Sequence, residues 1–225
     1  MDHTDQKITN WHPDILPRPT KKALDTLSQA DWLTKSTWYL AGGTALALFA
    51  GHRQSLDLDF FTPEKDFPVE KLLRNLENLE WITDIAEPGT VYGRLHTAKI
   101  SFIAYPFFIY KEEPLQYGTI RILSPHDIAV MKTIAISQRG KKRDFIDLYW
   151  YVHHGEPLID ILRCLPKQYP TIAHDYHHIL KSLRYFDDAE SDPMPELFFT
   201  GDWKTIKSYF QREIPIIIKK LLDLQ

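Results

Sequence analysis

Cysteine is nearly absent from this chain of 225 residues, since Cys164 is the only one. A disulfide within the chain and a zinc site made of cysteines are therefore excluded. An excess of positive charge is also missing, because 27 Lys and Arg residues face 30 Asp and Glu residues and the formal net charge is −3. This balance excludes a chain-wide cationic surface for nucleic acid, but it leaves room for a local basic patch.

Long apolar runs are missing too. The run Ile-Pro-Ile-Ile-Ile ends at Lys219, far short of the roughly 20 apolar residues that span a bilayer. Residues 1–19 contain neither the basic start nor the apolar stretch of a secretory signal. We therefore expect a cytoplasmic protein with no membrane partner, and the single cysteine fits a reducing compartment.

The composition is that of an ordinary globular protein, with 44% hydrophobic and 25% charged residues. The length allows one large domain or two small lobes that share a cleft. Changes of pattern along the chain favour two lobes. We expect an N-terminal arm over 1–19, an α/β lobe over 20–123, and a helical lobe over 124–225 that completes the cleft.

The predicted α/β lobe alternates helical and strand patterns. Apolar residues at helical spacing predict helices over 20–33, 44–50 and 68–79. Short β-branched and aromatic segments bounded by Gly and Pro predict the strands 38–41, 56–61, 81–88, 90–97, 99–110 and 117–123. The expected fold class is α+β, with a mixed sheet and flanking helices.

From Ser124 onward the pattern is helical almost throughout. Ser124 is a good N-cap and Pro125 suits the first helical position, so a helix is expected over 124–138. A second helix follows over 142–154, and at least three more are expected before Gln225.

Two aspartates stand in an apolar strand pattern, Leu-Asp-Leu-Asp-Phe-Phe. Asp57 and Asp59 are two positions apart, so on a strand they share one face at about 6.5 Å between Cα atoms. Their neighbours Leu56, Leu58 and Phe60 would face a core. Paired carboxylates on a rigid strand suit Mg²⁺, which commonly shares its remaining positions with substrate phosphates. The alternative is a half-exposed edge strand that merely alternates polar and apolar residues.

The segment before this strand favours the metal site. Gly42 and Gly43 allow the backbone to approach a ligand closely, and a helix that begins at Thr44 presents free N–H groups to an anion. A glycine turn, a short helix and then Asp-x-Asp is a more specific combination than either part alone. It predicts a phosphate cradle beside a metal-binding pair.

Two blocks of the chain resemble the signature of the AbiEii/AbiGii nucleotidyltransferase toxins, a family of the DNA polymerase β-like superfamily. The first block is LAGGTALALFAGHRQSLDLDFF, 40–61. The second is MKTIAISQRGKKRDFIDLYW, 131–150, with a lysine-bearing helix, Arg-Gly-Lys and Arg-Asp-x-x-Asp-Leu-Tyr. The resemblance covers about 20–155. It implies a polymerase β-like nucleotidyltransferase lobe followed by a helical lobe.

The resemblance implies a role for each residue that matches the signature. Asp57 and Asp59 would hold Mg²⁺ (or Mn²⁺) and the triphosphate, and Asp144 would complete the catalytic set from the helical lobe. Lys132 would neutralise triphosphate charge, and the nucleotide phosphates would lie in a cradle formed by Gly42, Gly43 and Thr44.

Several neighbouring residues are further candidates. Arg53 and His52 immediately precede the aspartate strand, where they either contact a phosphate or base or are ordinary loop residues. Asp147 shares a helical face with Asp144 and is a secondary candidate, with a solvated charged face as the alternative. The aromatic stretch 105–110 either stacks nucleobases or is a buried strand and its turn.

A basic run lies beside Asp144. Its cations could bind an RNA backbone, although a solvated turn between two helices would look similar. The position next to the proposed active site favours RNA, so the candidate RNA-binding residues are Arg139, Lys141, Lys142 and Arg143.

One position departs from the superfamily pattern. Polymerase β-like enzymes usually carry a third carboxylate on a neighbouring strand, where this chain has Ser101. A serine binds a cation weakly and cannot act as a general base near neutral pH. Either Asp144 supplies the missing carboxylate, or the activity is weak or lost.

We therefore expect a metal-dependent nucleotidyltransferase that moves a nucleoside monophosphate from an NTP to an acceptor hydroxyl. The resemblance implies that the acceptor is RNA, the 3′ end of tRNA, and that the protein is a toxin with a cognate antitoxin. Two alternatives stay open. One is a catalytically degenerate nucleotide-binding module that acts through a partner, and the other is a nucleotidyltransferase that modifies a protein or a small molecule.

Overall fold

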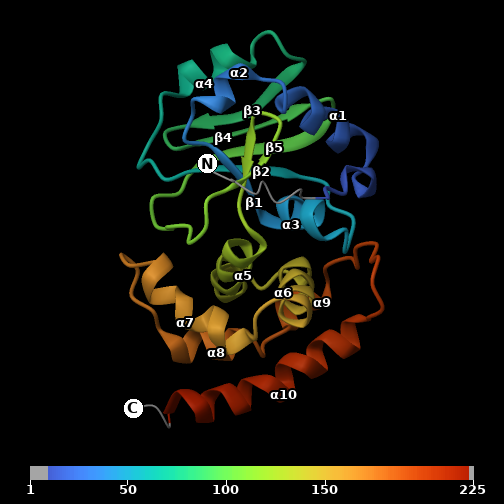
Figure 1. Cartoon of the computed structure of the whole chain (residues 1–225), viewed down its shortest axis with the longest axis vertical. Coiled ribbons are helices and arrows are strands. Elements are labelled where there is room, and N and C mark those ends of the chain that lie inside the picture. Colours follow the sequence, from blue (N-terminus) through green and yellow to red (C-terminus); the bar gives the residue numbers. More distant parts are fainter. Residues whose placement is uncertain (1–9, 223–225) are drawn as a thin grey trace, which may run out of the picture.

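A mixed sheet of seven strands forms the N-terminal part of the molecule (Figure 1). The computed structural model describes residues 10–222. The strand order is β3-β4-β5-β2-β1-β7-β6, with β2 antiparallel to β1 and parallel to β5. The bounds are β1 Tyr39–Ala41, β2 Leu58–Thr62, β3 Trp81–Glu87, β4 Thr90–Leu95, β5 Ala98–Ala104, β6 Leu115–Tyr117 and β7 Ile120–Ile122. The α+β fold class is thereby confirmed.

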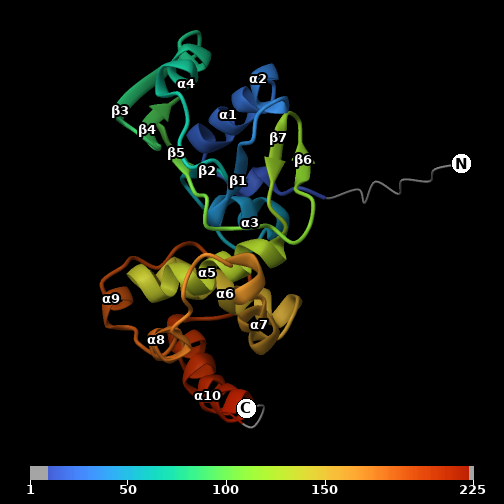
Figure 2. The ribbon, with the colours of Figure 1, turned by 90° about the vertical axis from the view of Figure 1, so that its left-hand side faces the viewer.

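Helices flank this sheet and then form the C-terminal part of the molecule. Figures 1 and 2 show α1, α2 and α4 on one side of the sheet and α3 on the other, next to α5. Among residues 10–222, no helix is both long and apolar enough to cross a membrane. The bounds are α1 Arg18–Leu27, α2 Asp31–Thr34, α3 Gly42–Ala50, α4 Val69–Leu76, α5 Pro125–Arg139, α6 Lys142–His154, α7 Leu158–Gln168, α8 Tyr176–Ser182, α9 Asp187–Glu190 and α10 Trp203–Leu222.

An aromatic core fills the space between the sheet and the helices α1, α2 and α4. Phe60 of β2 stacks on Phe102 of β5 with ring centroids 5.0 Å apart, and Trp32, Trp38 and Trp81 contact the same Phe102 ring. Both phenylalanines are fully buried. This packing turns the opposite face of β2, which carries Asp59, away from the aromatic core.

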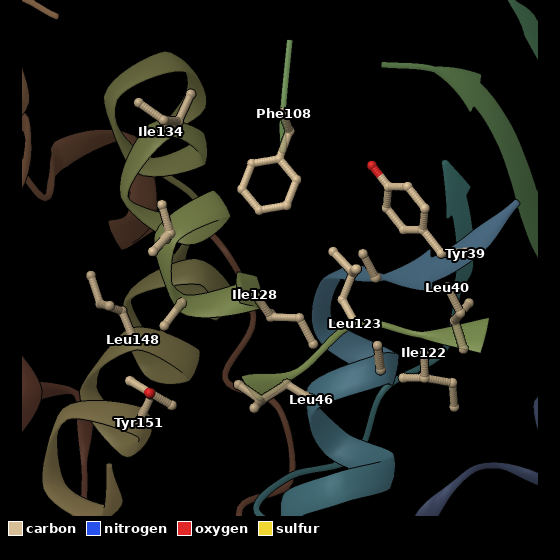
Figure 3. Packing of buried hydrophobic residues seen from close by; sticks show 14 of the residues in the cluster. Tyr39, Leu40, Leu46, Phe108, Ile122, Leu123, Ile128, Ile134, Leu148 and Tyr151 are labelled. Atoms are coloured by element: carbon tan, nitrogen blue, oxygen red, sulfur yellow. The ribbon is translucent and has the colours of Figure 1, made fainter. Parts of the chain in front are cut away.

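A second layer of the core joins the sheet to the C-terminal helices. Figure 3 shows Ile128 of α5 pointing towards Leu123 and Leu46, with Leu148 and Tyr151 of α6 behind it. These residues belong to one continuous cluster of buried side chains. Hydrophobic contact therefore fixes α5 and α6 against α3, which positions them beside the aspartate strand.

The sequence correctly predicted most elements, and the larger differences concern where they begin and end. The helix expected over 20–33 is divided into α1 and α2, because the β6–β7 turn packs against the chain there and Thr119 N–H donates to the Ser28 carbonyl. The segment 117–123, expected to be one strand, contains the end of β6, a turn with Gly118 at φ +58°, and the strand β7. The strand expected over 99–110 ends at Ala104, just before the Tyr105-Pro106 turn.

One prediction about a side-chain position was wrong. Leu56 does not face the core but is 58% exposed, because β2 begins only at Leu58 and strand alternation does not extend back to Leu56. The part of the predicted N-terminal arm that the structure describes, residues 10–19, packs against the rest of the fold. There Leu16 is buried and His12 N–H donates to the Leu48 carbonyl at 2.8 Å, while residues 1–9 of the predicted arm lie outside the described residues.

Candidate active site

Asp59 lies in the middle of the sheet, on the strand β2. It pairs with Ala41 of β1 on one side and with Ser101 of β5 on the other. The Ser101 hydroxyl donates a hydrogen bond to Asp59 Oδ1 at 2.7 Å. Ser101 therefore occupies the position next to the aspartate pair where the family pattern led us to look for a third carboxylate.

Asp57 lies just before β2 and is held from two sides. The Thr44 hydroxyl of α3 donates to the Asp57 carbonyl and also pairs with the Ser55 hydroxyl at 2.8 Å. The Asp57 carboxylate accepts from Arg143 Nη1 at 3.3 Å. Thr44 is buried, so the structure gives it a bracing contact with the aspartate segment, while its predicted contact with a phosphate stays a prediction.

The donor set of the two aspartates fits a hard divalent cation. Burial raises the pKa of Asp59, and the nearby negative charge of Asp57 raises it further. A cation between the two carboxylates would relieve this repulsion. Within residues 10–222, no group of three or more His, Cys, Asp or Glu side chains is placed to hold a metal. Substrate oxygens and water would therefore have to supply the remaining ligands.

Gly42 and Gly43 are the first residues of α3 rather than a turn before a helix that begins at Thr44, and this glycine turn of the helix lies directly against the aspartate pair. Gly42 has φ +74°, and a Cβ atom there would lie 3.1 Å from Asp59 Oδ2. A Cβ atom at Gly43 would lie 2.3 Å from Arg53 Nη2, which no folded structure tolerates without a shift. The N-cap Ala41 provides no side-chain hydrogen bond, so the first N–H groups of α3 are available to an anion.

A network of buried charges lies beneath this turn. Lys132 Nζ of α5 lies 2.6 Å from Asp144 Oδ1 and 2.7 Å from Asp147 Oδ2, both on α6. Arg53 donates from Nε to Asp147 Oδ1 at 2.6 Å and from Nη2 to Oδ2 at 2.8 Å. His52 Nε2 also bonds to Asp147 Oδ1 at 2.8 Å. Asp147 thus joins the loop before β2 to both helices.

The two aspartates of this network remain ionised because of these cations. Burial alone would raise the pKa of Asp144, but Lys132 and Arg139 outweigh it and lower that pKa. Burial is outweighed in the same way at Asp147, where Arg53 and Lys132 hold the pKa well below its ordinary value. Neither carboxylate has exposed surface. The contacts of Asp144 are those of a residue that positions cations, and its predicted place in the catalytic set stays a prediction.

A cleft of about 360 Å³ lies between the sheet and the helices α5 and α6. One part of its lining is polar, with the aspartate pair, the glycine turn, Lys132, Gln138, Arg139 and Arg143. The other part is apolar or aromatic, with Phe61, Tyr92, Ile103, Tyr105, Ile128 and Met131. The lining of the cleft thus combines cations and N–H groups with apolar and aromatic surface, a combination that suits a nucleotide.

The four predicted RNA-binding residues do not lie together in the structure. Arg139 and Arg143 line the cleft, each with about half of its side chain exposed, and pair with Asp144 and Asp57 respectively. Lys141 lies outside the cleft and pairs with Asp192 at 3.3 Å. Lys142 is buried, and its ammonium donates to the carbonyls of Glu190 and Asp192. The run therefore contains two cleft residues, one surface residue and one structural residue.

Sequence reasoning missed the segment that follows α9. Gln54 N–H donates to the Glu196 carbonyl and Phe198 N–H donates to the His52 carbonyl, so residues 196–198 pair with the loop that carries Arg53. The paired residues are more than 140 positions apart in the chain, so no local sequence pattern indicates this contact. Tyr92, on β4, was also missed because an alternating aromatic in a strand is usually an ordinary packing residue.

Known proteins are similar to this chain in sequence or in fold. An uncharacterized protein of Aquifex aeolicus (strain VF5) is 36% identical over 184 residues, which are 79% of this chain and 86% of the relative. A putative nucleotidyltransferase from H. pylori superposes with a TM-score of 0.51 at 21% identity, over 91% of this chain and 96% of that one. MenT4, a nucleotidyltransferase toxin from Mycobacterium tuberculosis H37Rv, gives 0.53 at 14% identity over 88% and 86%.

At such identities the two solved structures establish the fold alone. The family itself rests on a direct match, since the family model described as "Nucleotidyl transferase AbiEii toxin, Type IV TA system" covers residues 23–220. The match includes both sequence blocks, the aspartate pair and the buried network. The chain therefore belongs to the AbiEii family of nucleotidyltransferase toxins.

Proposed function

We propose that this chain transfers a nucleoside monophosphate from an NTP to an RNA in a Mg²⁺-dependent reaction. The acceptor is the hydroxyl group at the 3′ end of tRNA. The protein would act as the toxin of a pair with a cognate antitoxin. One observation carries the proposal. The Asp57–Asp59 pair, the glycine turn at Gly42 and two cleft arginines line one cleft of nucleotide size.

The polar residues that line the cleft would hold the triphosphate. The N–H groups at the start of α3 offer hydrogen bonds to phosphate oxygens, and Arg139 and Arg143 add positive charge from the opposite wall. Lys132 lines the same wall. Asp57 and Asp59 would hold the divalent cation, which when bound neutralises phosphate charge and aligns the reacting oxygens.

The reaction exchanges one phosphorus–oxygen bond for another. The acceptor hydroxyl oxygen bonds to the α-phosphorus, and the bond from that phosphorus to the oxygen bridging the β-phosphate breaks. Pyrophosphate leaves, and the hydroxyl proton is released to solvent. The protein contributes mainly by positioning and charge, as is usual in phosphoryl transfer, so a site without a carboxylate at Ser101 is chemically reasonable.

Asp144 and Asp147 would act as positioning residues. They do not reach the cleft surface, but they hold Lys132, Arg139 and Arg53 against its walls. Without them these cations would lose both their fixed geometry and the charge that keeps them stable when buried. Lys142 is left out of the RNA contact, because its ammonium already bonds to backbone carbonyls.

Label transfer tests the proposal directly. The purified protein is incubated with Mg²⁺, total tRNA and each α-labelled NTP in turn, beside the variants Asp57→Asn and Asp59→Asn. We expect label on RNA with the native chain and none with either variant. Asp160→Asn on the surface of α7 is a matched control that should label RNA normally. Label on a protein or small molecule instead of RNA would overturn the choice of acceptor.

The serine at position 101 favours a second candidate, a nucleotide-binding module without transferase activity. This candidate predicts Mg²⁺-dependent NTP binding, measured by calorimetry, together with no labelled product from any NTP or cell extract. The two proposals are thus separated by the same protein preparations. Loss of NTP binding in Asp57→Asn would be expected from both.

A further inference from the structure

A second hollow adjoins the aspartate pair. It has a volume of about 190 Å³ and is lined by residues of β3, β4 and β5. Asp57, Asp59 and Tyr92 line this hollow and also the nucleotide cleft. The two hollows therefore meet at the aspartate pair, and the second contains neither glycine of the glycine turn nor any residue of α5 or α6.

The chemistry of the proposed reaction assigns different reactants to these hollows. In phosphoryl transfer the attacking and leaving oxygens lie roughly in line on opposite sides of the phosphorus. Pyrophosphate leaves on the side of the glycine turn and the arginines of α5 and α6. The acceptor hydroxyl must then arrive away from these groups, and the second hollow reaches the aspartate pair without containing any of them.

A row of paired residues leads outward from Asp59 across this side of the sheet. Asp59 pairs with Ser101, Ser101 with Tyr92, and Tyr92 with Ile85 on the edge strand β3. Directly paired residues share one face of a sheet. Tyr92 is two strands from Asp59, a spacing of about 10 Å, which is within reach of one nucleotide. Its ring is 40% exposed.

Lys99 lies on the same face, two positions before Ser101 on β5. It is exposed, and it forms no salt bridge with any described residue. Its cross-strand partner Arg94 differs, because Arg94 donates to both carboxylate oxygens of Asp84 at 2.8 and 3.1 Å. The hollow thus carries one lysine without a salt bridge to a described residue and one exposed tyrosine, beside the aspartate pair and Asp84. Arg94 already pairs with Asp84, and the divalent cation would neutralise the other two carboxylates.

We propose that Tyr92 and Lys99 form the acceptor face, which binds the unpaired 3′ end of an RNA. The Tyr92 ring stacks on the terminal base, and the Lys99 ammonium binds a backbone phosphate. An exposed ring beside a free cation is the combination that binds single strands, because every base offers a flat surface and every linkage a negative charge. This inference rests on the proposed function and names where its acceptor lies.

RNA binding by variants tests the acceptor face. Binding of a short single-stranded RNA with a 5′ fluorophore is measured by anisotropy at several salt concentrations, and NTP binding is measured separately by calorimetry. Tyr92→Ala should weaken RNA binding by about 5- to 100-fold, whereas Tyr92→Phe, which keeps the ring, should not. Lys99→Ala should weaken binding and reduce the salt dependence by about one phosphate contact. Lys71→Ala, an exposed lysine on α4, is the matched control for charge.

A second measurement does not depend on affinity. RNA carrying 4-thiouridine at its 3′ end should crosslink within residues 90–101 in the native chain. A crosslink confined to α5 or α6 would overturn the acceptor face. So would Tyr92→Ala weakening NTP binding as much as RNA binding, because the ring would then stack on the nucleotide substrate.

Different results would contradict the transferase activity and the acceptor face. If the native chain labels RNA but Tyr92→Ala and Lys99→Ala bind RNA normally, the acceptor face is wrong and the transferase stands. If the native chain neither binds nor labels RNA but labels a protein, both the RNA acceptor and this face for RNA are wrong.

Discussion

Arg53 and Asp147, 94 positions apart in the chain, form a buried bidentate salt bridge. Nε and Nη2 of the arginine donate to the two carboxylate oxygens. The same carboxylate also accepts Lys132 and His52. Because Gly43 packs against the arginine, this pair connects the floor of the nucleotide cleft to α6. Stability and activity should therefore be coupled at this point.

Replacing Asp147 by Asn should strongly destabilise the fold. Arg53 and Lys132 would lose a shared negative charge while still buried, and breaking a buried ion pair in this way costs about 3–5 kcal/mol. Urea unfolding followed by circular dichroism measures the change. Asp160→Asn, which removes a half-exposed pair with Arg163, is the control and should have almost no effect. A loss below about 1 kcal/mol for Asp147→Asn would show that the buried network contributes little.

Gly43→Ala should damage the same network from the other side. The added methyl group would meet Arg53 Nη2 at 2.3 Å, so the guanidinium must move away from Asp147. We expect a loss of about 1–3 kcal/mol of unfolding free energy. In a double-mutant cycle with Asp147→Asn, the two losses should fall short of additivity by at least about 0.5 kcal/mol, because both variants break one contact. Additive losses would mean that the glycine acts through something other than Arg53.

Local patterns were enough to predict the active-site strand and the elements around it. The short helix α3, which begins at Gly42 and thus two residues earlier than predicted, and the alternation of Asp59 with Leu58 and Phe60 are set by neighbours in sequence. The start of α5 is similar, since Ser124 does accept a hydrogen bond from Asp127 N–H with Pro125 in the first turn. Such features need no knowledge of tertiary contacts.

The rest of the site depends on contacts between distant residues, which no local pattern contains. Nothing near His52 in sequence indicates that its partner is Asp147, and nothing near Lys142 indicates the carbonyl of Glu190. A basic run therefore looked uniform in sequence, although burial separates its members. The β6 strand was missed for a related reason, because Leu-Gln-Tyr is too short to show alternation and is held by pairing with β7.

The pH dependence of stability should reveal the buried histidine. Burial lowers the pKa of His52 below its ordinary value of 6.5, despite the Asp147 contact, so the folded protein keeps this ring neutral where the unfolded chain protonates it. Its contribution to stability is then fully present above about pH 6.5 and is lost as the pH falls through that value towards the lowered pKa. The depressed pKa of Asp147 acts in the same direction, but only below about pH 4.

His52→Gln separates these two effects, since a glutamine amide can still donate to Asp147 but does not titrate. Between about pH 7 and pH 5 the native chain should lose stability by up to about 1.4 kcal/mol per pH unit, and the variant should show a flatter profile. Urea midpoints across this range measure both. If the variant kept the full slope, another group would be responsible for it.

Ser101→Asp should convert the aspartate pair into a stronger metal site. The new carboxylate would lie beside Asp59, where the serine hydroxyl now donates at 2.7 Å. In chelator the variant should melt below the native chain, because three carboxylates repel one another. With saturating Mg²⁺ its melting temperature should rise more than that of the native chain. A tenfold gain in affinity corresponds to about 1.4 kcal/mol, or about 3–6 °C for a chain of this size. Ser101→Ala, which removes the hydrogen bond without adding charge, should show no such gain. Equal Mg²⁺ responses in the native chain and both variants would place the cation elsewhere than at Asp57 and Asp59.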